Sequence, residues 1–492
     1  MERQDDSSEP QPTAGGEGGR IARVARATPL LVLAYFGLNA LLRSLTPGGL
    51  GLDEAELVLH AQRPELAYGP QPPLYGWLQA AAFAVLGVGK PALAVVKAIV
   101  LATAFLALWA TARRSGADVR LALAAVLAMA LIPGITWEGQ RALAHTPLAL
   151  ALAALALAAF VEARTRGGWA RHLLLGGVLG VAGLAYWSAA FIGAGIAATL
   201  VLRRRAPWPQ VAATFALAAV IVAPTLGWYG AHPDALTAAA QRVDVAATGP
   251  WGTLAALAEA VGATLGLPLA VLALALARRP KAPRARGLRA AARADLSLVL
   301  LVAAGAFAVL AVAAGLSEVK ERYLTPVLFA APLLVLAWAP RRLTAARAGW
   351  LGAGVGALLL AVTAGLQWNW RVGAGEPPPQ AAPFAALATP LTTDAPTVFT
   401  TSEWIGGNLR LMMPDRVVLT PENAAMRLQV ATPVAFVWPP SRGDTPPRAL
   451  VALFEARFDR PPRLAPVEQL VAPFSPPHAD APPFALHRTL AR

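Results

Sequence analysis

Long apolar runs separated by short, basic loops follow one another along most of this 492-residue chain. A helix needs roughly 20 apolar residues to cross the hydrocarbon core of a bilayer, and about eleven stretches approach or reach that length. We therefore expect a mainly α-helical, polytopic membrane protein with about 11 transmembrane helices. The predicted spans lie near residues 27–45, 91–112, 121–134, 146–161, 172–202 (divided into two), 209–228, 254–276, 296–316, 323–338 and 349–367.

The composition excludes an ordinary soluble enzyme, because 56% of the residues are hydrophobic and only 14% are charged. The chain has no cysteine, which excludes disulfides and thiolate metal sites. A formal charge of +14 can indicate a nucleic-acid partner, but the basic residues concentrate in short loops between apolar runs. That distribution is typical of cytoplasmic loops, so we expect no nucleic-acid partner.

The basic clusters also predict the topology. If the amino terminus is inside and the 172–202 run is broken near residues 186–188, every basic cluster between spans lies in the cytoplasm. A single span there would place Arg203–Arg205 outside and invert all later loops. The outward segments are then 46–90, 134–145, the turn near 187, 229–253, 317–322 and the part after about 370.

Three parts of the chain are predicted. Residues 1–26 are expected to form a disordered cytoplasmic tail. Residues 27–370 form a transmembrane domain with a large outer loop at 46–90. Residues 371–492, with short apolar runs and frequent proline, predict a small extracytoplasmic α/β domain. Its strands are expected near 398–401, 417–419, 434–438 and 484–490, and its helices near 403–413 and 449–458.

The outer loop after the first span carries a pair of carboxylates, Asp53 and Glu54, with Glu56 and His60 close by. Acidic residues in the first turn of a helix are favoured by the helix dipole, which is the simpler interpretation of the pair. Two neighbouring carboxylates can also hold different protonation states, as acid–base chemistry requires. The segment Gln71–Leu78 then leads through two prolines into an amphipathic helix suited to the membrane interface.

A second outer loop, Ser317–Pro326, concentrates charged and aromatic side chains. These side chains can be a solvated set of ion pairs, which contribute little at a surface. Lys320 and Arg322 at an outer interface also suit a lipid phosphate, which must be bound and then stabilised as it leaves. We favour phosphate binding by these two residues, with Tyr323 beside them.

Other polar residues stand out because they interrupt apolar runs or share an outer segment. Lys97 and Glu259 fall inside apolar runs, where a charge is costly and suggests function, although snorkelling toward the outer surface also explains them. Lys90 and Lys97 are further candidates to line a phosphate pocket. A divalent metal ion is a candidate cofactor, although no ligand spacing is diagnostic. Its candidate ligands are His60, His145, His232, Asp234, Asp244 and the nearby acids.

The order of a span, Leu-Asp-Glu-Ala at 52–55, Pro-Pro-Leu-Tyr-Gly-Trp-Leu at 72–78 and a second span resembles the membrane glycosyltransferases of the GT-C class. The nearest branch contains the protein O-mannosyltransferases and the bacterial aminoarabinose transferases for lipid A (glycosyltransferase family 39-like). The resemblance covers roughly residues 28–340 and is densest in 46–90. It implies a polyprenyl-phosphate-linked sugar donor and transfer on the outer face of the membrane.

Carried over to this sequence, the resemblance makes Asp53 the catalytic candidate, with Glu54 positioning it or the acceptor. The family has a similar basic and aromatic stretch where this chain has Lys320, Arg322 and Tyr323. Tyr75 is a candidate to shape the sugar pocket, although aromatic side chains at an interface are common membrane anchors.

One outer loop departs from the family pattern. The bacterial branch usually carries Asp before a small residue, Pro and Leu, whereas this chain has His145. Glu138, Arg141 and His145 are candidate substrate-binding residues of this loop. Either Glu138 or His145 replaces the second carboxylate, or His145 is a packing or capping residue.

We therefore expect an inverting glycosyltransferase of the bacterial inner membrane, with its active site on the periplasmic side. The expected partners are a polyprenyl phosphate sugar, an envelope acceptor (lipid, glycan or protein) and membrane lipids. Aminoarabinose, a hexuronic acid, mannose and other hexoses remain open as the sugar. The alternatives are a transporter or flippase of lipid-linked sugars and a catalytically inactive scaffold of the same fold.

Overall fold

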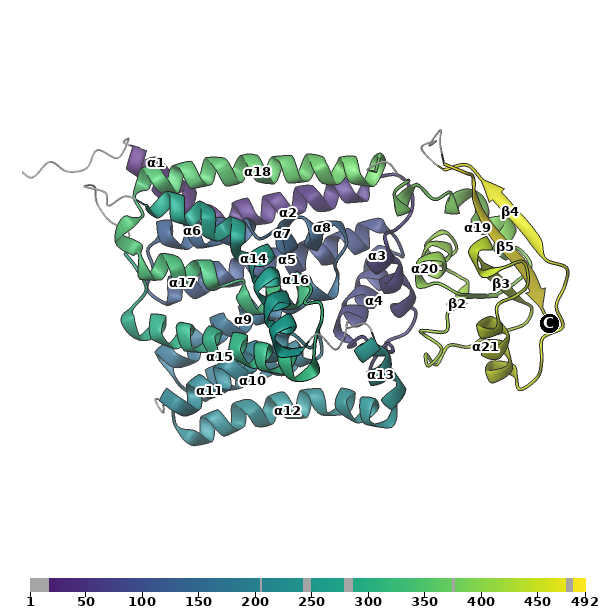
Figure 1. Ribbon diagram of the computed structural model, residues 1–492, viewed down its shortest axis with the longest axis horizontal. Coiled ribbons are helices and arrows are strands. Elements are labelled where there is room, and N and C mark those ends of the chain that lie inside the picture. Colours follow the sequence, from purple (N-terminus) through teal and green to yellow (C-terminus); the bar gives the residue numbers. More distant parts are fainter. Residues whose placement is uncertain (1–16, 204–205, 242–248, 278–285, 374–376, 475–480) are drawn as a thin grey trace, which may run out of the picture.

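A computed structural model describes residues 17–203, 206–241, 249–277, 286–373, 377–474 and 481–492. Helices that run roughly along the long axis fill most of the molecule, and a sheet with its own helices lies at one end (Figure 1). The protein is thus a mainly α-helical, polytopic membrane protein with a small C-terminal sheet region, as the sequence predicts.

The helical part contains eighteen α-helices in the described residues. They are α1 (Glu17–Arg26), α2 (Thr28–Ser44), α3 (Leu52–His60), α4 (Leu74–Leu86), α5 (Lys90–Arg114), α6 (Val119–Ala130), α7 (Pro133–Thr136), α8 (Glu138–Arg141), α9 (His145–Arg166), α10 (Trp169–Gly183), α11 (Ala189–Arg203), α12 (Trp208–Ala231), α13 (Pro233–Gln241), α14 (Gly249–Leu276), α15 (Ala290–Ala314), α16 (Glu321–Leu328), α17 (Ala331–Trp338) and α18 (Ala345–Arg371).

Each expected span coincides with one or two of these helices. Six of the described helices are individually long and apolar enough to cross a bilayer, and eight spans result if each of two bent helix pairs counts as one. The number of eleven crossings therefore stays a prediction. The 172–202 run is broken as expected, since α10 ends at Gly183 and α11 begins at Ala189.

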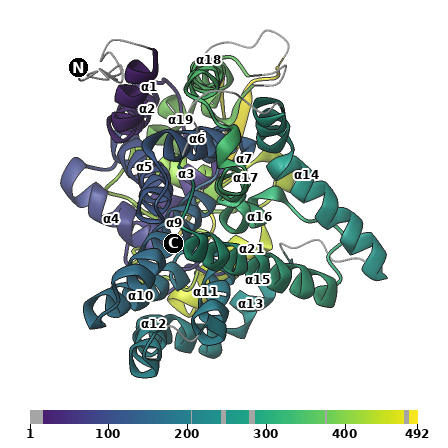
Figure 2. The ribbon, with the colours of Figure 1, turned by 90° about the vertical axis from the view of Figure 1, so that its left-hand side faces the viewer.

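Helix α9 lies at the centre of the helical part (Figure 2). Of its most apolar stretch, 89% is buried inside the protein, compared with 17% for α12, so α12 presents most of its surface to lipid. Small residues allow close packing: a Cβ atom at Gly176 of α10 would lie 2.4 Å from the carbonyl oxygen of Thr214 in α12.

Two features differ from the sequence-based expectations. The predicted disordered tail over residues 1–26 is wrong for residues 17–26, which form α1; residues 1–16 lie outside the described part. Helix α1 forms because its apolar side chains find partners, with Ala25 fully buried and Ile21 packed against Gly349 of α18. The span expected near 323–338 is divided into α16 and α17.

The C-terminal part contains a five-stranded sheet with the order β2–β1–β3–β5–β4. Strands β1 (Thr397–Thr400), β2 (Val417–Leu419) and β3 (Val434–Trp438) are parallel, whereas β5 (Phe484–Ala491) is antiparallel to β3 and β4 (Glu468–Ala472). Helices α19 (Phe384–Thr392), α20 (Glu403–Met412) and α21 (Arg448–Phe458) accompany it. The sequence predicted every strand except β4, an edge strand whose side chains are mostly exposed.

The outer loop with α3 and α4 lies between the long helices and the sheet (Figure 1). Helix α3 packs against α20 so closely that a Cβ atom at Gly407 would lie 2.1 Å from the carbonyl oxygen of Ala55. The side chains of Trp404 and Asn408 hydrogen-bond the backbone of Leu50, with donor–acceptor distances of 2.8 and 2.7 Å. The sheet region therefore fixes the loop that carries the paired carboxylates.

Candidate active site

Asp53 and Glu54 lie in the first turn of α3, which begins after the extended residue Gly51. Asp53 is half-buried, and its Oδ2 atom accepts a hydrogen bond of 3.0 Å from the backbone N–H of Ala144, just before α9. Asp53 thus belongs to the first turn of α3, and its carboxylate is bound by the residue just before α9, which lies far along the chain.

Glu54 is paired with Arg43 of α2. Both side chains are buried, and Arg43 Nε donates to Glu54 Oε1 at 2.9 Å while its Nη2 atom donates to Oε2. Burial alone would raise the pKa of Glu54, but the charge and hydrogen bonds of Arg43 lower it to about 2. Glu54 is therefore ionised, and its oxygens are committed to Arg43 and to the backbone N–H of Gly51.

Arg43 is a partner of the paired carboxylates that the sequence interpretation missed. Arg43 lies in the last turn of α2, at the end of the first apolar run. Its guanidinium lies over the ring of Trp370, 5.1 Å from the ring centroid. The available signal was a single arginine inside a membrane-spanning stretch, which calls for a partner of opposite charge.

Asp53 lies in a different electrostatic environment from its neighbour. Burial raises the pKa of Asp53, and the charges of Lys97 and Arg322 and the N–H of Ala144 offset that effect only in part. Lys97 is buried in α5, and within the described chain its Nζ atom has no hydrogen-bond partner. A carboxylate with a raised pKa beside two cations is suited to accept a proton.

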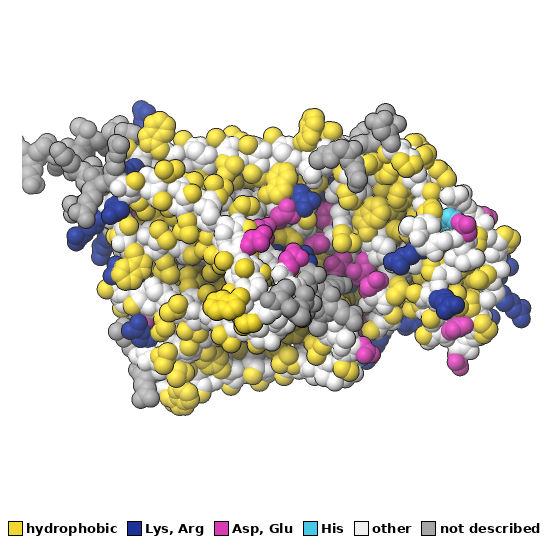
Figure 3. All heavy atoms as spheres, viewed as in Figure 1, with side chains coloured by type: hydrophobic (Ala, Val, Ile, Leu, Met, Phe, Trp, Pro, Cys, Tyr) yellow, Lys and Arg dark blue, Asp and Glu magenta, His cyan; other side chains and the backbone are white. Residues whose placement is uncertain are grey.

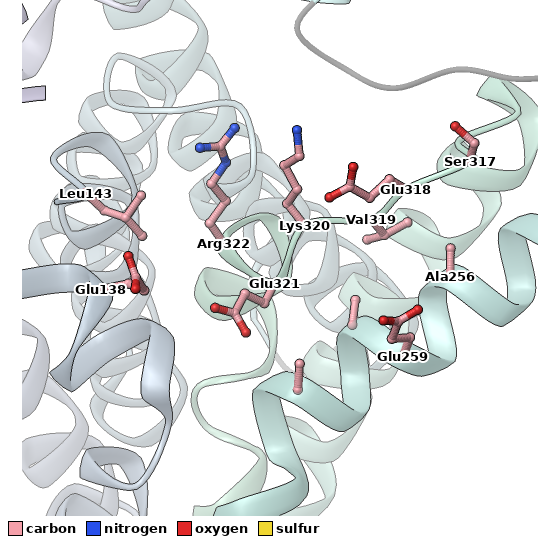
Figure 4. A pocket seen from close by; sticks show the side chains of 12 residues that line it. Glu138, Leu143, Ala256, Glu259, Ser317, Glu318, Val319, Lys320, Glu321 and Arg322 are labelled. Atoms are coloured by element: carbon pink, nitrogen blue, oxygen red, sulfur yellow. The ribbon is translucent and has the colours of Figure 1, made fainter. Parts of the chain in front are cut away.

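A cavity of about 360 Å³ lies between α8, α14 and the start of α16 (Figure 4). Its lining includes Lys320 and Arg322 and four glutamates, namely Glu138, Glu259, Glu318 and Glu321. Leu143, which also lines it, precedes the Ala144 that binds Asp53. Lys320, just before α16, and Arg322, in the first turn of α16, extend in the same direction (Figure 4). Figure 3 shows charged side chains gathered in the middle of a mostly apolar face.

Four predicted site residues, Tyr75, His145, Arg322 and Tyr323, make ring contacts, and Tyr186 is a further partner. Tyr75 is fully buried, and its ring contacts His145 edge-on with centroids 5.8 Å apart. The His145 ring stacks at 6.2 Å on Tyr186. The guanidinium of Arg322 lies 5.3 Å from the ring centroid of Tyr323 and donates to its hydroxyl at 3.5 Å. Tyr75, His145 and Tyr186 thus form one aromatic group, and Arg322 forms a contact with Tyr323.

Lys90 and Arg141 already have partners in this structure. Lys90 Nζ donates to the carbonyl oxygens of Thr46 and Gly48, the latter at 2.8 Å, so it holds the start of the outer loop. Arg141 pairs with Glu138 at 2.8 Å, so these predicted site residues are neighbours on α8. Glu259, noted as a charge in an apolar run, lines the cavity.

Comparison with known proteins places these features in a family. Residues 70–228 match the family of the dolichyl-phosphate-mannose-protein mannosyltransferases. The lipopolysaccharide core galacturonosyltransferase RgtA of Rhizobium johnstonii is 30% identical over 469 residues, which cover 89% of this chain and 91% of that protein. This chain belongs to the GT-C membrane glycosyltransferases, in the protein O-mannosyltransferase and aminoarabinose transferase branch.

Further relatives of this glycosyltransferase agree. RgtB of the same organism, also a lipopolysaccharide core galacturonosyltransferase, is 32% identical over 316 residues, or 62% of this chain and 63% of that protein. The crystal structure of ArnT from Cupriavidus metallidurans bound to undecaprenyl phosphate has a TM-score of 0.58 at 14% identity and covers 97% of this chain and 98% of that one. Its apo state has a TM-score of 0.60 at 13% identity and covers 96% and 98%. The GT-C fold expected from the sequence is confirmed.

The metal ligands considered from the sequence do not form one site in this glycosyltransferase, because His60 groups with Glu56 and Glu403 and not with His145 or His232. Asp234 is exposed on α13, His232 stacks on Trp228, and Asp244 lies outside the described residues. Among the residues that the structure describes, one group has metal-ligating atoms close together, and it contains His60 with Glu56 and Glu403.

Proposed function

We propose that this glycosyltransferase transfers a sugar from a polyprenyl phosphate donor to an acceptor of the cell envelope, on the periplasmic face of the inner membrane. The observation that carries the proposal is the hydrogen bond from Ala144 to the Asp53 carboxylate, because Leu143, the residue before Ala144, lines the same cavity as Lys320 and Arg322. That arrangement supplies a base and two cations at one place, which is what displacement of a lipid phosphate by a hydroxyl requires.

In this proposal the reaction is a single displacement with inversion at the anomeric carbon. The acceptor hydroxyl gives its proton to Asp53 while its oxygen forms a bond to the anomeric carbon. The bond between that carbon and the phosphate oxygen breaks, and its electron pair leaves with the polyprenyl phosphate. The phosphate gains negative charge as it leaves, and Lys320 and Arg322 stabilise that charge.

Glu54 acts as a positioning residue in this scheme rather than as a second base. Its low pKa and its two bonds to Arg43 leave it a poor proton acceptor, but they fix the first turn of α3 and so the direction of Asp53. His145 lies between Tyr75 and Tyr186, which supports a packing role. Glu138 is the acid that faces the cavity from the same outer loop.

We further propose galacturonic acid as the sugar and the lipopolysaccharide core as the acceptor. The support is the name that two relatives share, one of them aligned over 89% of this chain. The carboxylate of a galacturonic acid is an anion that Lys320 or Arg322 can pair with in the cavity.

The test is donor turnover by protein purified in detergent, with polyprenyl phosphate galacturonic acid, mannose or aminoarabinose as alternative donors and lipopolysaccharide core as acceptor. We expect free polyprenyl phosphate and an acceptor heavier by one galacturonic acid. Turnover of another donor would correct the sugar alone. Binding of every donor without turnover would contradict catalysis and favour a transporter or an inactive scaffold, because transport has no meaning in detergent.

A further inference from the structure

Three metal-ligating side chains from distant parts of the sequence meet where α3 contacts α20. Glu56 and His60 are one helical turn apart on α3, and Glu403 is the first residue of α20. His60 Nε2 lies 3.9 Å from Glu56 Oε1 and 3.6 Å from Glu403 Oε1. One ligand atom from each residue lies within 4.8 Å of those of the other two.

The burial of this group requires an explanation. His60 is 1% exposed, and the two carboxylates are nearly as enclosed. Both distances from Nε2 are longer than a hydrogen bond, so the imidazole is aimed at the carboxylates without bonding them. The ring stacks on Tyr68 with centroids 4.4 Å apart, and its Nδ1 atom has no hydrogen-bond partner among the described residues.

The ligand types of the group suit a divalent cation, because one imidazole nitrogen and two carboxylate oxygens converge there. Zinc takes histidine nitrogen and carboxylate oxygen at roughly 2.0–2.2 Å in a tetrahedron, whose edges are roughly 3.3–3.6 Å. The two separations from His60 Nε2, 3.6 and 3.9 Å, lie at or just above that edge length.

We propose that Glu56, His60 and Glu403 bind a divalent cation of the zinc type, with one position open to water. The site is distinct from the cavity that Lys320 and Arg322 line, because Asp53 lies seven residues before His60, about 10 Å along the axis of α3. Its ligands do not touch the reacting groups of the proposed mechanism. The ion links the helix that presents Asp53 to the sheet region.

The link acts on an interface that is already close-packed. Ala55 lies against Gly407 and Leu59 against Gly406, so α3 and α20 are in close contact next to the three ligands. An ion that bridges α3 and α20 binds only while the two helices are in contact. Its binding free energy therefore stabilises that contact. Removing the ion should therefore weaken the contact between α20 of the sheet region and α3.

The experiment measures metal content and thermal stability of the full-length protein, purified through a tag that contains no histidine. Elemental analysis after dialysis against micromolar ZnCl₂ should give about one zinc per chain. Glu403→Gln, a substitution that keeps the shape of the side chain, should weaken zinc affinity at least about 10- to 100-fold. A chelator should lower the melting temperature of the wild type and leave that of Glu403→Gln unchanged.

His232→Ala is the matched control, because this exposed histidine lies outside the group and should leave the zinc content at the wild-type level. His60→Ala should also lose the ion, and Glu403→Gln decides the outcome if His60→Ala does not fold. A dialysed wild type without zinc, or equal zinc in wild type and Glu403→Gln, would overturn the proposal. So would a melting temperature that depends on pH and not on zinc, since it would indicate a protonated His60. None of these measurements uses a sugar donor, so the outcome is independent of the proposed reaction.

Discussion

The backbone N–H of Ala144 donates to Asp53 Oδ2 at 3.0 Å and so connects the start of α3 to the start of α9, 91 residues apart. The bond fixes the carboxylate beside the wall of the cavity, because Leu143 is part of that wall. This hydrogen bond also favours the ionised form of Asp53, and its donor is a backbone group, so no second side chain is needed. The predictions below follow from this placement and from the contacts that support it.

The buried pair of Arg43 and Glu54 should be essential to stability. Arg43→Ala leaves a buried carboxylate without its partner, which should cost about 3–5 kcal/mol in the free energy of unfolding. The double substitution Arg43→Leu and Glu54→Leu should recover most of that loss, because two apolar side chains need no counter-charge. Denaturant unfolding in detergent measures both. Arg166→Ala, which breaks an exposed pair with Glu162, should change stability by less than about 1 kcal/mol.

Stability should also depend on pH through Glu54. Because its pKa is about 2 in the folded protein, below the ordinary value of 4.5, the ionised form is favoured by folding. The stabilisation is present above the ordinary pKa and is lost as the pH falls from there toward 2. The part of the acid-induced loss of stability that comes from Glu54 should therefore be absent from the Arg43→Leu and Glu54→Leu double variant. An identical acid limb in the wild type and the double variant would contradict this account of the pair.

Arg322 should contribute to the chemical step rather than to folding. Arg322→Ala should lower kcat about 10²- to 10³-fold, because the leaving phosphate loses a charged donor. Arg322→Lys should retain part of the activity, since it keeps the charge but not the planar fork. Arg371→Ala, at an exposed arginine at the end of α18, should behave as the wild type. Equal kcat for the wild type and Arg322→Ala would show that another cation stabilises the phosphate.

The pH dependence of turnover should report Asp53. A base must be unprotonated to act, so kcat/KM should rise with pH through the pKa of Asp53 and then level off. Burial raises that pKa above its ordinary value, so the rise should occur at higher pH than for an exposed aspartate. Initial rates between pH 4 and 9, in buffers of constant ionic strength, test this. A flat profile down to the ordinary pKa of an aspartate would contradict a base at this position.

Gly407 should be necessary for the contact between α20 and α3. Gly407→Ala places a Cβ atom 2.1 Å from the carbonyl oxygen of Ala55, which forces the helices apart and should cost about 1–3 kcal/mol. Activity should fall as well, since α3 carries Asp53. Gly354→Ala is the control, because a Cβ atom there meets only open space in α18. Unchanged melting temperature and activity in Gly407→Ala would mean that the close contact has no role in holding α3.

The sequence predicts those parts of the fold that hydropathy and charge determine. The break near residues 186–188 follows from the alternation of basic loops, and the structure has it between α10 and α11. Helix α1 was missed because only its packing against α6 and α18 stabilises it, and a polar, basic segment has no such signal by itself. Strand β4 was missed because its exposed edge lacks a buried face.

For the site, the sequence indicates residue types but not their partners. Asp53 was found because a carboxylate pair after a membrane span is unusual, and the resemblance to a known family gave it a role. Its contact with Ala144 and the pairing of Arg43 with Glu54 depend on how helices pack, which a single sequence does not encode locally. The same holds for His60 and Glu403, which lie 343 positions apart and meet only because α20 docks on α3.

Donor turnover by Asp53→Asn tests the central claim most directly. The substitution keeps the size of the side chain and removes the base, so kcat should fall about 10²- to 10⁴-fold while the melting temperature and donor affinity stay near those of the wild type. Asp234→Asn, at an exposed acid on α13, serves as the control and should keep full activity. Full turnover by a correctly folded Asp53→Asn protein would contradict the proposed mechanism.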